Sequence, residues 1–242
     1  MITPTLELER ELADQGYDLI AGFDEVGRGA LAGPVMVGCA MVHARDLADD
    51  APTPLAVPDG VADSKLLTEH AREAIFGELC DWCAAWAVGQ ASNAEIDEWG
   101  ITYALGVAAL RALEQAEHAL GLGADGDSPR SGLEPGLVRV GAILDGPSDY
   151  ITKALNTFDA PDVPVPADVV TKVKGDRYCA SVATAAVIAK VTRDQLMIEL
   201  GGDKRYEAYG WAQNKGYGSA AHREAIAQYG PTSLHRVSWH LV

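Results

Sequence analysis

The stretch that decides the fold is LIAGFDEVGRGALAGPVMVGCAMV, residues 19–42. It contains two apolar runs, 19–23 and 34–42, separated by a glycine-rich connection. Apolar runs of this length around glycines are typical of two buried strands joined by a turn, so we expect a hairpin here. The first run leads directly into Asp24 and Glu25, which places two carboxylates at the end of a buried strand.

Beyond the hairpin, strand-like and helix-like patterns are mixed along the chain. They predict, in chain order, a helix over 68–83 with Thr68 as its N-cap, a strand over 86–91, a helix over 96–120, strands over 138–144 and 169–173, a helix over 180–200 and a smaller helical part over 204–240. Stretches rich in Pro, Gly, Asp and Ser, at 46–62 and 121–136, are predicted to be loops. Because strands and helices are mixed without an internal repeat, the predicted class is α/β.

The composition is that of an ordinary soluble protein, with 242 residues of which 48% are hydrophobic and 22% charged. No apolar run approaches the ~18 residues of a membrane-spanning helix, and the first twenty residues contain no apolar signal segment. The sequence therefore argues against an integral membrane protein. We expect a cytoplasmic protein with reduced thiols, because the chain has only four cysteines, Cys39, Cys80, Cys83 and Cys179.

The net charge of −16 argues against nonspecific binding to nucleic acid or to anionic membranes. The charge is unevenly distributed, however. Residues 172–236 contain ten Lys or Arg and six Asp or Glu, so this region is +4 and the rest of the chain is −20. The asymmetry fits either a solvated surface or a polyanionic partner, and charge alone does not decide between them.

Three predicted strands end in or near carboxylates, namely Asp24 with Glu25, Asp145, and Asp176. Strand ends in open α/β sheets gather at one edge, where several carboxylates would repel one another unless a divalent ion lay between them. Oxygen-only ligands favour hard ions such as Mg²⁺ or Mn²⁺. For Asp145 a structural alternative stays open, because Asp-Gly is a common turn.

The connection after the first strand contains Gly27-Arg28-Gly29. Glycine lacks a Cβ, so this backbone fits a ligand that approaches closely, and its amides can bind sugar hydroxyls or phosphate oxygens. The pattern is not a dinucleotide fingerprint, because Gly33 follows Gly29 after four residues rather than three.

Residues 22–35, GFDEVGRGALAGPV, closely resemble the signature of prokaryotic ribonuclease HII, the type 2 RNase H family. Further motifs follow in the order of that family, and the resemblance spans roughly residues 19–239. They are Asp63-Ser64-Lys65, Asp145-Gly146, Lys174-Gly175-Asp176, Lys190-Val191-Thr192-Arg193-Asp194, Lys215-Gly216-Tyr217-Gly218 and His235-Arg236.

The resemblance implies an RNase H-like fold, a mixed five-stranded sheet flanked by helices. It implies an N-terminal extension over 1–18, a catalytic domain over 19–200 and a C-terminal helical appendage over 201–242. The implied activity is a metal-dependent endonuclease of ribonucleotide repair. It would cut the RNA strand of RNA–DNA hybrids and nick duplex DNA 5′ of embedded ribonucleotides, leaving 3′-hydroxyl and 5′-phosphate ends.

The same resemblance assigns roles to individual residues. It implies that Asp24, Glu25 and Asp145 bind two Mg²⁺ or Mn²⁺ ions and that Asp176 completes this acidic set. The implied substrate-binding residues are Gly27, Arg28 and Gly29 at the ribose 2′-hydroxyl, Tyr217 at the neighbouring deoxyribose, and Ser64 and Lys65 at phosphate.

The sequence departs from the family pattern on the helix that follows Asp176. Ala183 and Ala186 stand where many members carry serine, which puts a phosphate contact from those positions in doubt, although Ser181 could supply a hydroxyl nearby.

Two alternatives remain within reach of the sequence. One is a nuclease of different preference, such as a ribonuclease HIII-like enzyme or a junction resolvase; the other is a catalytically silent nucleic-acid-binding module. The silent module predicts a missing ligand, whereas all four acidic positions are filled. We expect a monomer and no membrane partner, and recruitment by a replication clamp stays open.

Overall fold

A five-stranded mixed sheet forms the centre of the computed structural model, which describes residues 3–62, 64, 67–123 and 138–242. The strand order is β3-β2-β1-β4-β5. β1 pairs antiparallel with β2 and parallel with β4, while β3 extends the antiparallel side and β5 the parallel side. This confirms the predicted mixed sheet and the initial hairpin. The strands are β1 (Leu19–Val26), β2 (Val35–His43), β3 (Ala85–Ala91), β4 (Val140–Asp145) and β5 (Ala167–Lys172).

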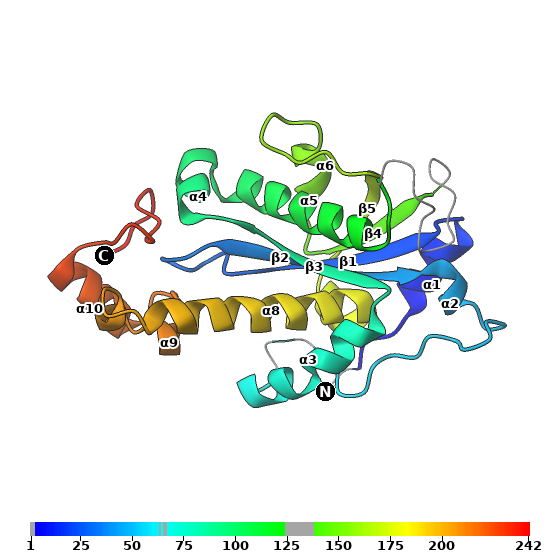
Figure 1. Cartoon of the computed structure of the whole chain (residues 1–242), viewed down its shortest axis with the longest axis horizontal. Helices are drawn as coiled ribbons and strands as arrows, with labels where there is room; N and C mark the ends of the chain where they lie inside the picture. Colours follow the sequence, from blue (N-terminus) through cyan, green and yellow to red (C-terminus); the bar gives the residue numbers. More distant parts are fainter. Residues whose placement is uncertain (1–2, 63, 65–66, 124–137) are drawn as a thin grey trace.

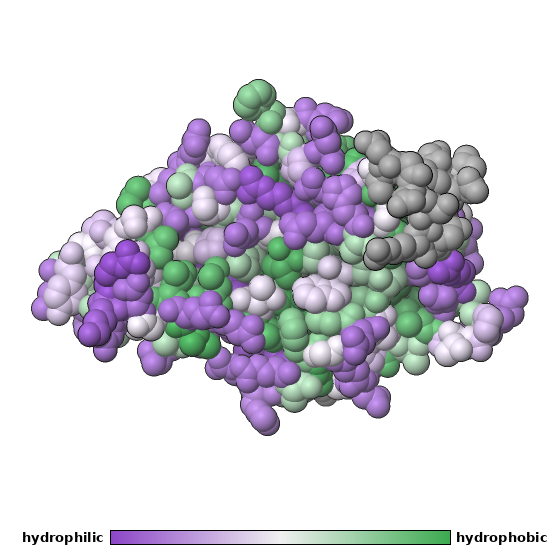
Figure 2. Space-filling model, viewed as in Figure 1, coloured by the Kyte–Doolittle hydropathy of each residue, from purple (hydrophilic) through white to green (hydrophobic). Residues whose placement is uncertain are grey.

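Two long helices cover the opposite faces of this sheet, α5 (Ile101–Ala119) on one and α8 (Ala180–Gly201) on the other (Figure 1). α5 packs on β2 and β3, and α8 packs on β1 and β2. Figure 2 shows hydrophobic residues in a band across the middle of one face, between these two helical layers. The shorter helices are α1 (Glu7–Asp14), α2 (Ala44–Leu47), α3 (Glu69–Trp82), α4 (Asn93–Trp99), α6 (Ile151–Ala154), α7 (Gly175–Tyr178), η1 (Glu207–Tyr209), α9 (Trp211–Asn214) and α10 (Ala220–Tyr229).

Glycines in β1 and β2 allow α8 to lie very close to the sheet. A Cβ on Gly22 would lie 2.3 Å from the carbonyl carbon of Ser181, and one on Gly38 would lie 2.3 Å from the carbonyl oxygen of Ala185. Since real Cβ atoms do not approach backbone this closely, both positions require glycine. The close packing fixes the first turns of α8 against the middle of β1 and β2.

The helix predicted over 96–120 is wrong as a single element, because it is two helices, α4 and α5, separated at Gly100. Gly100 has φ 79° and ψ 153°, which is incompatible with a continuous α-helix. α4 begins at Asn93 and is capped by Ser92, whose side chain accepts from the N–H of Glu95 while the Glu95 carboxylate accepts from the N–H of Ser92. This capping box was the sequence signal for an independent short helix. The N-cap predicted at Thr68 is confirmed.

Both ends of the chain pack onto the central unit. Near the N-terminus, Thr5 forms an isolated parallel β-bridge with Cys179. The buried Glu9 accepts hydrogen bonds from the N–H and the hydroxyl of Ser181. Near the C-terminus, α9 packs on α8, with Trp211 fully buried. The predicted domain boundaries at 18 and 200 stay predictions, and most of the predicted loop at 121–136 lies outside the described residues. Within the described chain, no helix is long and apolar enough to cross a membrane.

The tight contact between β1 and α8 leads to a stability prediction. Gly22→Ala should destabilise the protein by at least about 1–3 kcal/mol, because the new methyl group meets backbone that cannot rotate away. Gly77→Ala is the matched control, since its Cβ enters open space within α3, and it should stabilise by about 0.5–1 kcal/mol. Urea unfolding of both variants measures the difference, and equal stabilities would contradict the packing described.

Candidate active site

The predicted acidic residues come together at one edge of the sheet. β1 and β4 are parallel neighbours with Phe23 opposite Leu144, so Asp24 and Asp145 follow at the same level of adjacent strands. Asp176 lies in α7. The N–H of Gly175, its neighbour, donates to Asp145 Oδ1 at 2.7 Å. Two strands and one helical turn therefore place the carboxylates of Asp24, Asp145 and Asp176 around one end of the sheet.

Each of these carboxylates already has partners within the protein. Asp24, which is only 4% exposed, accepts from the N–H of Glu25 at 2.8 Å. Glu25 pairs with Arg28 at 3.2 Å and accepts from the Tyr150 hydroxyl at 3.3 Å. Burial, followed by the charges of Glu25 and Asp24, raises the pKa of Tyr150 well above its usual value. Tyr150 therefore stays protonated and donates a hydrogen bond to the Glu25 carboxylate.

The donor set fits a hard divalent ion, because all four candidate ligands are carboxylates. Among the residues that the structure describes, no group of three or more Asp, Glu, His or Cys side chains is placed so that it could hold a metal ion. The hydrogen bonds to Glu25 N–H and Gly175 N–H hold the carboxylates of Asp24 and Asp145 toward the protein. A bound ion would compete with these donors for the same oxygens.

A cavity of about 340 Å³ opens beside these carboxylates. Its described lining combines predicted metal ligands with predicted substrate-binding residues, and consists of Asp24, Glu25, Val26, Gly27, Arg28, Gly29, Ser64, Ala186, Lys190 and Tyr217. Asp145 and Asp176 are not in this set, and Lys65 lies outside the described residues. The structure thus gathers seven of the ten predicted site residues around one hollow.

Tyr217 is bound to the glycine-rich turn. Its hydroxyl accepts from the N–H of Gly27 at 3.1 Å, and its backbone forms an isolated antiparallel bridge with Ala30. The ring is partly buried, and the guanidinium of Arg193 lies 5.4 Å from its centroid. The position of Tyr217 beside Gly27 is therefore determined by backbone as well as by side-chain contacts.

The backbone at Ser64 is held by Arg72 of α3, which in turn contacts Asp194 of α8. The Arg72 guanidinium donates to the Ser64 carbonyl at 2.9 Å and lies 3.7 Å from Asp194. Asp194 also accepts from Lys190 at 2.6 Å. Lys190 and Arg72 thus share one carboxylate, which ties the Ser64 wall to the α8 wall of the cavity.

The suggestion that Ser181 could supply a phosphate-binding hydroxyl is wrong. Ser181 is fully buried, and its hydroxyl donates to Glu9 at 2.7 Å, at the start of α8. The cavity wall carries Ala186 instead, so α8 contributes no hydroxyl at that point. The described groups of α8 that face the cavity are a methyl group and the ammonium of Lys190.

Two buried histidines support Tyr217 from behind. His222 lies 2.9 Å from the Tyr217 carbonyl through Nδ1, and its Nε2 accepts from the Trp211 indole at 3.1 Å. The Nε2 atoms of His222 and His235 are 3.1 Å apart, and His235 Nδ1 accepts from the N–H of Thr232. These contacts fit two neutral rings, with the proton on Nδ1 of His222 and on Nε2 of His235, and the Nε2 lone pair of His222 is then shared by the N–H groups of Trp211 and His235.

Sequence reasoning missed Tyr150 and gave Arg236 no role of its own, and for Arg193 it left open a phosphate contact or a solvated helix face. Both arginines are fully buried, and the hydrogen bonds of their guanidinium groups go to backbone carbonyls of the turn between β1 and β2 and of the Lys215 region. The motifs around Arg193 and Arg236 were visible in the sequence. No signal in the sequence pointed to Tyr150.

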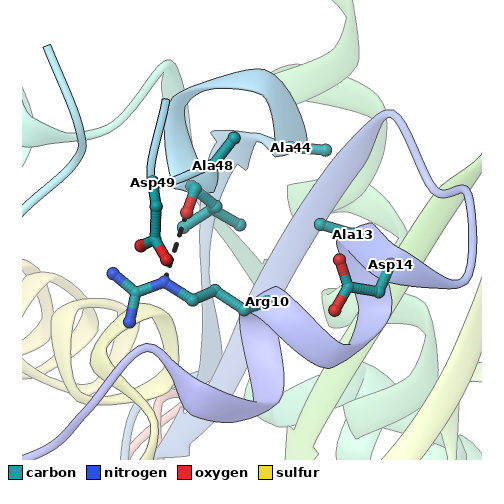
Figure 3. Close-up of a pocket in the computed structure, with 7 residues that line it drawn as sticks. Arg10, Ala13, Asp14, Ala44, Ala48 and Asp49 are labelled. Atoms are coloured by element: carbon teal, nitrogen blue, oxygen red, sulfur yellow. Dashed lines mark hydrogen bonds between the residues drawn. The ribbon is translucent and has the colours of Figure 1, made fainter. Parts of the chain in front are cut away.

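A second pocket, of about 390 Å³, lies where α1 meets α2 (Figure 3). Arg10 crosses it and donates to the Leu47 carbonyl at 3.2 Å, with Asp14 and Asp49 nearby. It lies beside the start of β1 rather than its end, and none of the predicted site residues lines it. The carboxylate edge is therefore the better candidate for chemistry.

The chain is similar to known proteins along most of its length. A family model described as Ribonuclease HII matches residues 21–242. A protein named Ribonuclease HII from Streptomyces avermitilis is 42% identical over 237 residues, which cover 98% of this chain and 83% of the relative.

Solved structures show the same fold. The ribonuclease H2 of Pyrococcus horikoshii OT3 superposes with a TM-score of 0.59 at 26% identity, over 92% of this chain and 94% of its own. Bst-RNase HIII in complex with Mn²⁺ gives a TM-score of 0.63 at 23% identity, over 95% and 70% of the two chains. The PCNA:RNase HII complex from Archaeoglobus fulgidus gives 0.59 at 23% identity, over 92% and 94%. These matches confirm the RNase H-like fold.

The histidine network leads to a pH prediction. Burial, and then the neighbouring His222, lower the pKa of His235 from 6.5 to about 4. Between pH 6.5 and pH 4, His235 is therefore protonated in the unfolded chain and neutral in the folded protein. Its contribution to the free energy of unfolding is thus fully present above pH 6.5 and is lost as the pH falls toward 4. We expect the stability advantage of wild type over His235→Gln to shrink by about 2 kcal/mol from pH 7 to pH 5.

Urea unfolding of both proteins at the two pH values measures this difference. Comparing the two proteins cancels the contributions of all other titrating groups. An advantage that is the same at pH 7 and pH 5 would show that His235 is protonated as easily in the folded protein as in the unfolded chain.

Proposed function

Because the chain belongs to the ribonuclease HII family, we propose that it is an endonuclease acting on RNA–DNA hybrids and on duplex DNA with embedded ribonucleotides. It would cut the RNA strand of a hybrid and nick a duplex 5′ of the ribonucleotide, leaving 3′-hydroxyl and 5′-phosphate ends. The observation that carries the proposal is the meeting of strand-end carboxylates with a cavity whose wall is Gly27-Arg28-Gly29. Groups for phosphodiester chemistry would then lie beside a backbone suited to contact a sugar.

We propose that Asp24, Glu25, Asp145 and Asp176 hold the divalent ions. When bound, two Mg²⁺ or Mn²⁺ ions would activate the attacking water and stabilise the leaving oxygen. Arg28 and Tyr150 then hold Glu25 in a fixed direction through its two oxygens. Gly175 N–H does the same for Asp145, so each of these carboxylates keeps a defined orientation.

Recognition of ribose is assigned to the backbone of the turn. A ribose is distinguished from a deoxyribose by its 2′-hydroxyl, which both donates and accepts hydrogen bonds. The cavity wall at Gly29 is open, since nothing lies within 4 Å of a Cβ built there. Tyr217, on the same wall, would pack on the neighbouring deoxyribose, and Ser64 would contact phosphate. The predicted phosphate contact of Lys65 concerns a residue outside the described chain.

The remaining expectations on partners and location stay predictions. The related RNase HII of Archaeoglobus fulgidus forms a complex with PCNA, and that partner is a property of the archaeal protein. For this chain, recruitment by a clamp, a monomeric state and a cytoplasmic location are separate expectations, and the proposed chemistry does not depend on them.

The direct test is cleavage of a DNA duplex with one ribonucleotide, with the cut mapped by product length. We expect a nick 5′ of the ribonucleotide with Mg²⁺ or Mn²⁺, and none after chelation by EDTA. Asp145→Asn should lower the rate at least about 100-fold, because lost charge stabilisation of ~3 kcal/mol corresponds to that factor. Asp168→Asn, an exposed aspartate on β5, is the matched control and should cleave normally. An intact duplex with wild type and metal would refute the proposal.

Gly29 provides a specific test of the proposed sugar contact. A methyl group there meets no protein atom, so Gly29→Ala should fold normally but intrude on the bound sugar and lower cleavage about tenfold or more. Gly27→Ala cannot serve this purpose, because its Cβ would lie 2.1 Å from Arg193 Nε and its φ is +81°. Gly77→Ala on α3 is the control for a glycine substitution in open space. Normal cleavage by Gly29→Ala would remove Gly29 from the sugar-binding wall.

A further inference from the structure

The turn that lines the cavity is bound from behind by one buried guanidinium. Arg236, with no exposed surface, donates to the Arg28 carbonyl at 2.9 Å and to the Gly27 carbonyl at 2.7 Å. It also donates twice to the Gly33 carbonyl, at 3.1 and 3.2 Å. Its guanidinium carbon lies 4.9 Å from the centroid of the Trp239 ring. Gly27 and Arg28 line the cavity, whereas Arg236 is not among the described residues that line it.

The contacts of Arg236 determine where two amide N–H groups point. In a planar trans peptide, the C=O of one residue and the N–H of the next point in opposite directions. The carbonyls of Gly27 and Arg28 are held toward Arg236, so the N–H groups of Arg28 and Gly29 are turned away from it. Neither N–H has a hydrogen-bond acceptor anywhere in the described chain. The N–H of Gly27, in contrast, is already bound to the Tyr217 hydroxyl.

We propose that Arg236 is a positioning residue for specificity, which directs the N–H groups of Arg28 and Gly29 toward the 2′-oxygen of the ribonucleotide. This inference rests on the proposed function. Arg236 does not touch the substrate itself and acts only through the two carbonyls that it binds. Selectivity for ribose then depends on a residue that follows the turn by more than 200 positions in the chain.

Arg193 shows that the effect belongs to Arg236 and is not common to both buried arginines. Arg193 is equally buried and also donates to three carbonyls, those of Ala32, Pro34 and Lys215. The N–H groups that follow two of these carbonyls have partners inside the protein, because Gly33 donates to Leu234 and Gly216 donates to Asn214. The third carbonyl, that of Pro34, is followed by Val35, the first residue of β2. Arg193 therefore holds the segment in place without directing an amide into the cavity.

A lysine cannot replace Arg236 in this role. The guanidinium is a rigid planar fork that reaches three carbonyls at once, whereas an ammonium is a single point of charge on a flexible stem. Burial lowers the pKa of Arg236 to about 9, so the group still carries its charge at neutral pH. Arg236→Lys thus keeps the charge and removes the geometry.

The test compares binding of two duplexes of identical sequence, one all-DNA and one with a single ribonucleotide, to the full chain in EDTA, where cleavage cannot occur. We expect Arg236→Lys to reduce the preference for the ribonucleotide duplex about tenfold, the equivalent of one or two hydrogen bonds, while affinity for the all-DNA duplex stays within twofold. Arg193→Lys is the matched control, with a comparable loss of thermal stability but an unchanged preference. A wild-type preference in Arg236→Lys, or an equal loss in Arg193→Lys, would overturn the inference.

Two further measurements keep the inference testable if Arg236→Lys does not fold. Guanidinium chloride at millimolar concentration should restore the ribose preference of Arg236→Ala, and KCl at equal ionic strength should not. In wild type, hydrogen exchange measured by NMR should show the Arg28 and Gly29 amides protected by the ribonucleotide duplex and not by the all-DNA duplex. Equal exchange with both duplexes would refute the assigned direction of these amides.

These outcomes separate the inference from the proposed function. If wild type cleaves the ribonucleotide duplex and the Arg236 variants keep its selectivity, only the proposed role of Arg236 is refuted. If wild type neither cleaves nor prefers the ribonucleotide duplex, both the proposed function and the role of Arg236 are refuted.

Discussion

The parallel pairing of β1 with β4 is the constraint on which the rest of the site depends. Because Phe23 stands opposite Leu144, the two strands end together, and Asp24 and Asp145 are forced to the same edge of the sheet. Bringing carboxylates out of water in this way is costly unless charge and hydrogen bonds compensate. The surrounding donors, Arg28, Tyr150 and the N–H of Gly175, supply part of that compensation. The divalent ions proposed for this edge would supply further positive charge.

The charge of the chain is distributed unevenly, and its positive part contributes to the candidate site. A protein of net charge −16 would repel a nucleic acid from most of its surface. The region from 172 to 236 is net positive, and it supplies Lys190 and Tyr217 to the cavity wall. It also supplies two buried guanidinium groups behind the β1–β2 turn. The net positive part of the chain is thus the part that supplies these residues to the proposed site.

How much of this could be predicted differs between residues for physical reasons. The carboxylates were predictable, because an acidic residue at the end of an apolar strand is visible locally in the sequence. The break at Gly100 was also encoded locally, by the capping box of Ser92 and Glu95, but the continuous apolar pattern of 96–120 concealed it. The role of Tyr150 was not predictable, because it depends on a hydrogen bond to Glu25, which lies 125 residues away in the chain. The burial of Ser181 against Glu9 likewise depends on how α1 packs.

A surface that recognises its ligand through backbone amides has a particular requirement. Amides are the same in every residue, so selectivity has to come from their direction, and direction has to be imposed by the surrounding structure. Here the turn after β1 is fixed by the Tyr217 hydroxyl, by the isolated bridges of Ala30 and Ala32, and by the Arg236 fork. All of these contacts come from beyond residue 201. The residues beyond 201 therefore help to determine the shape of this cavity wall, and the hydrogen bonds of His222 and His235 extend this support into the interior.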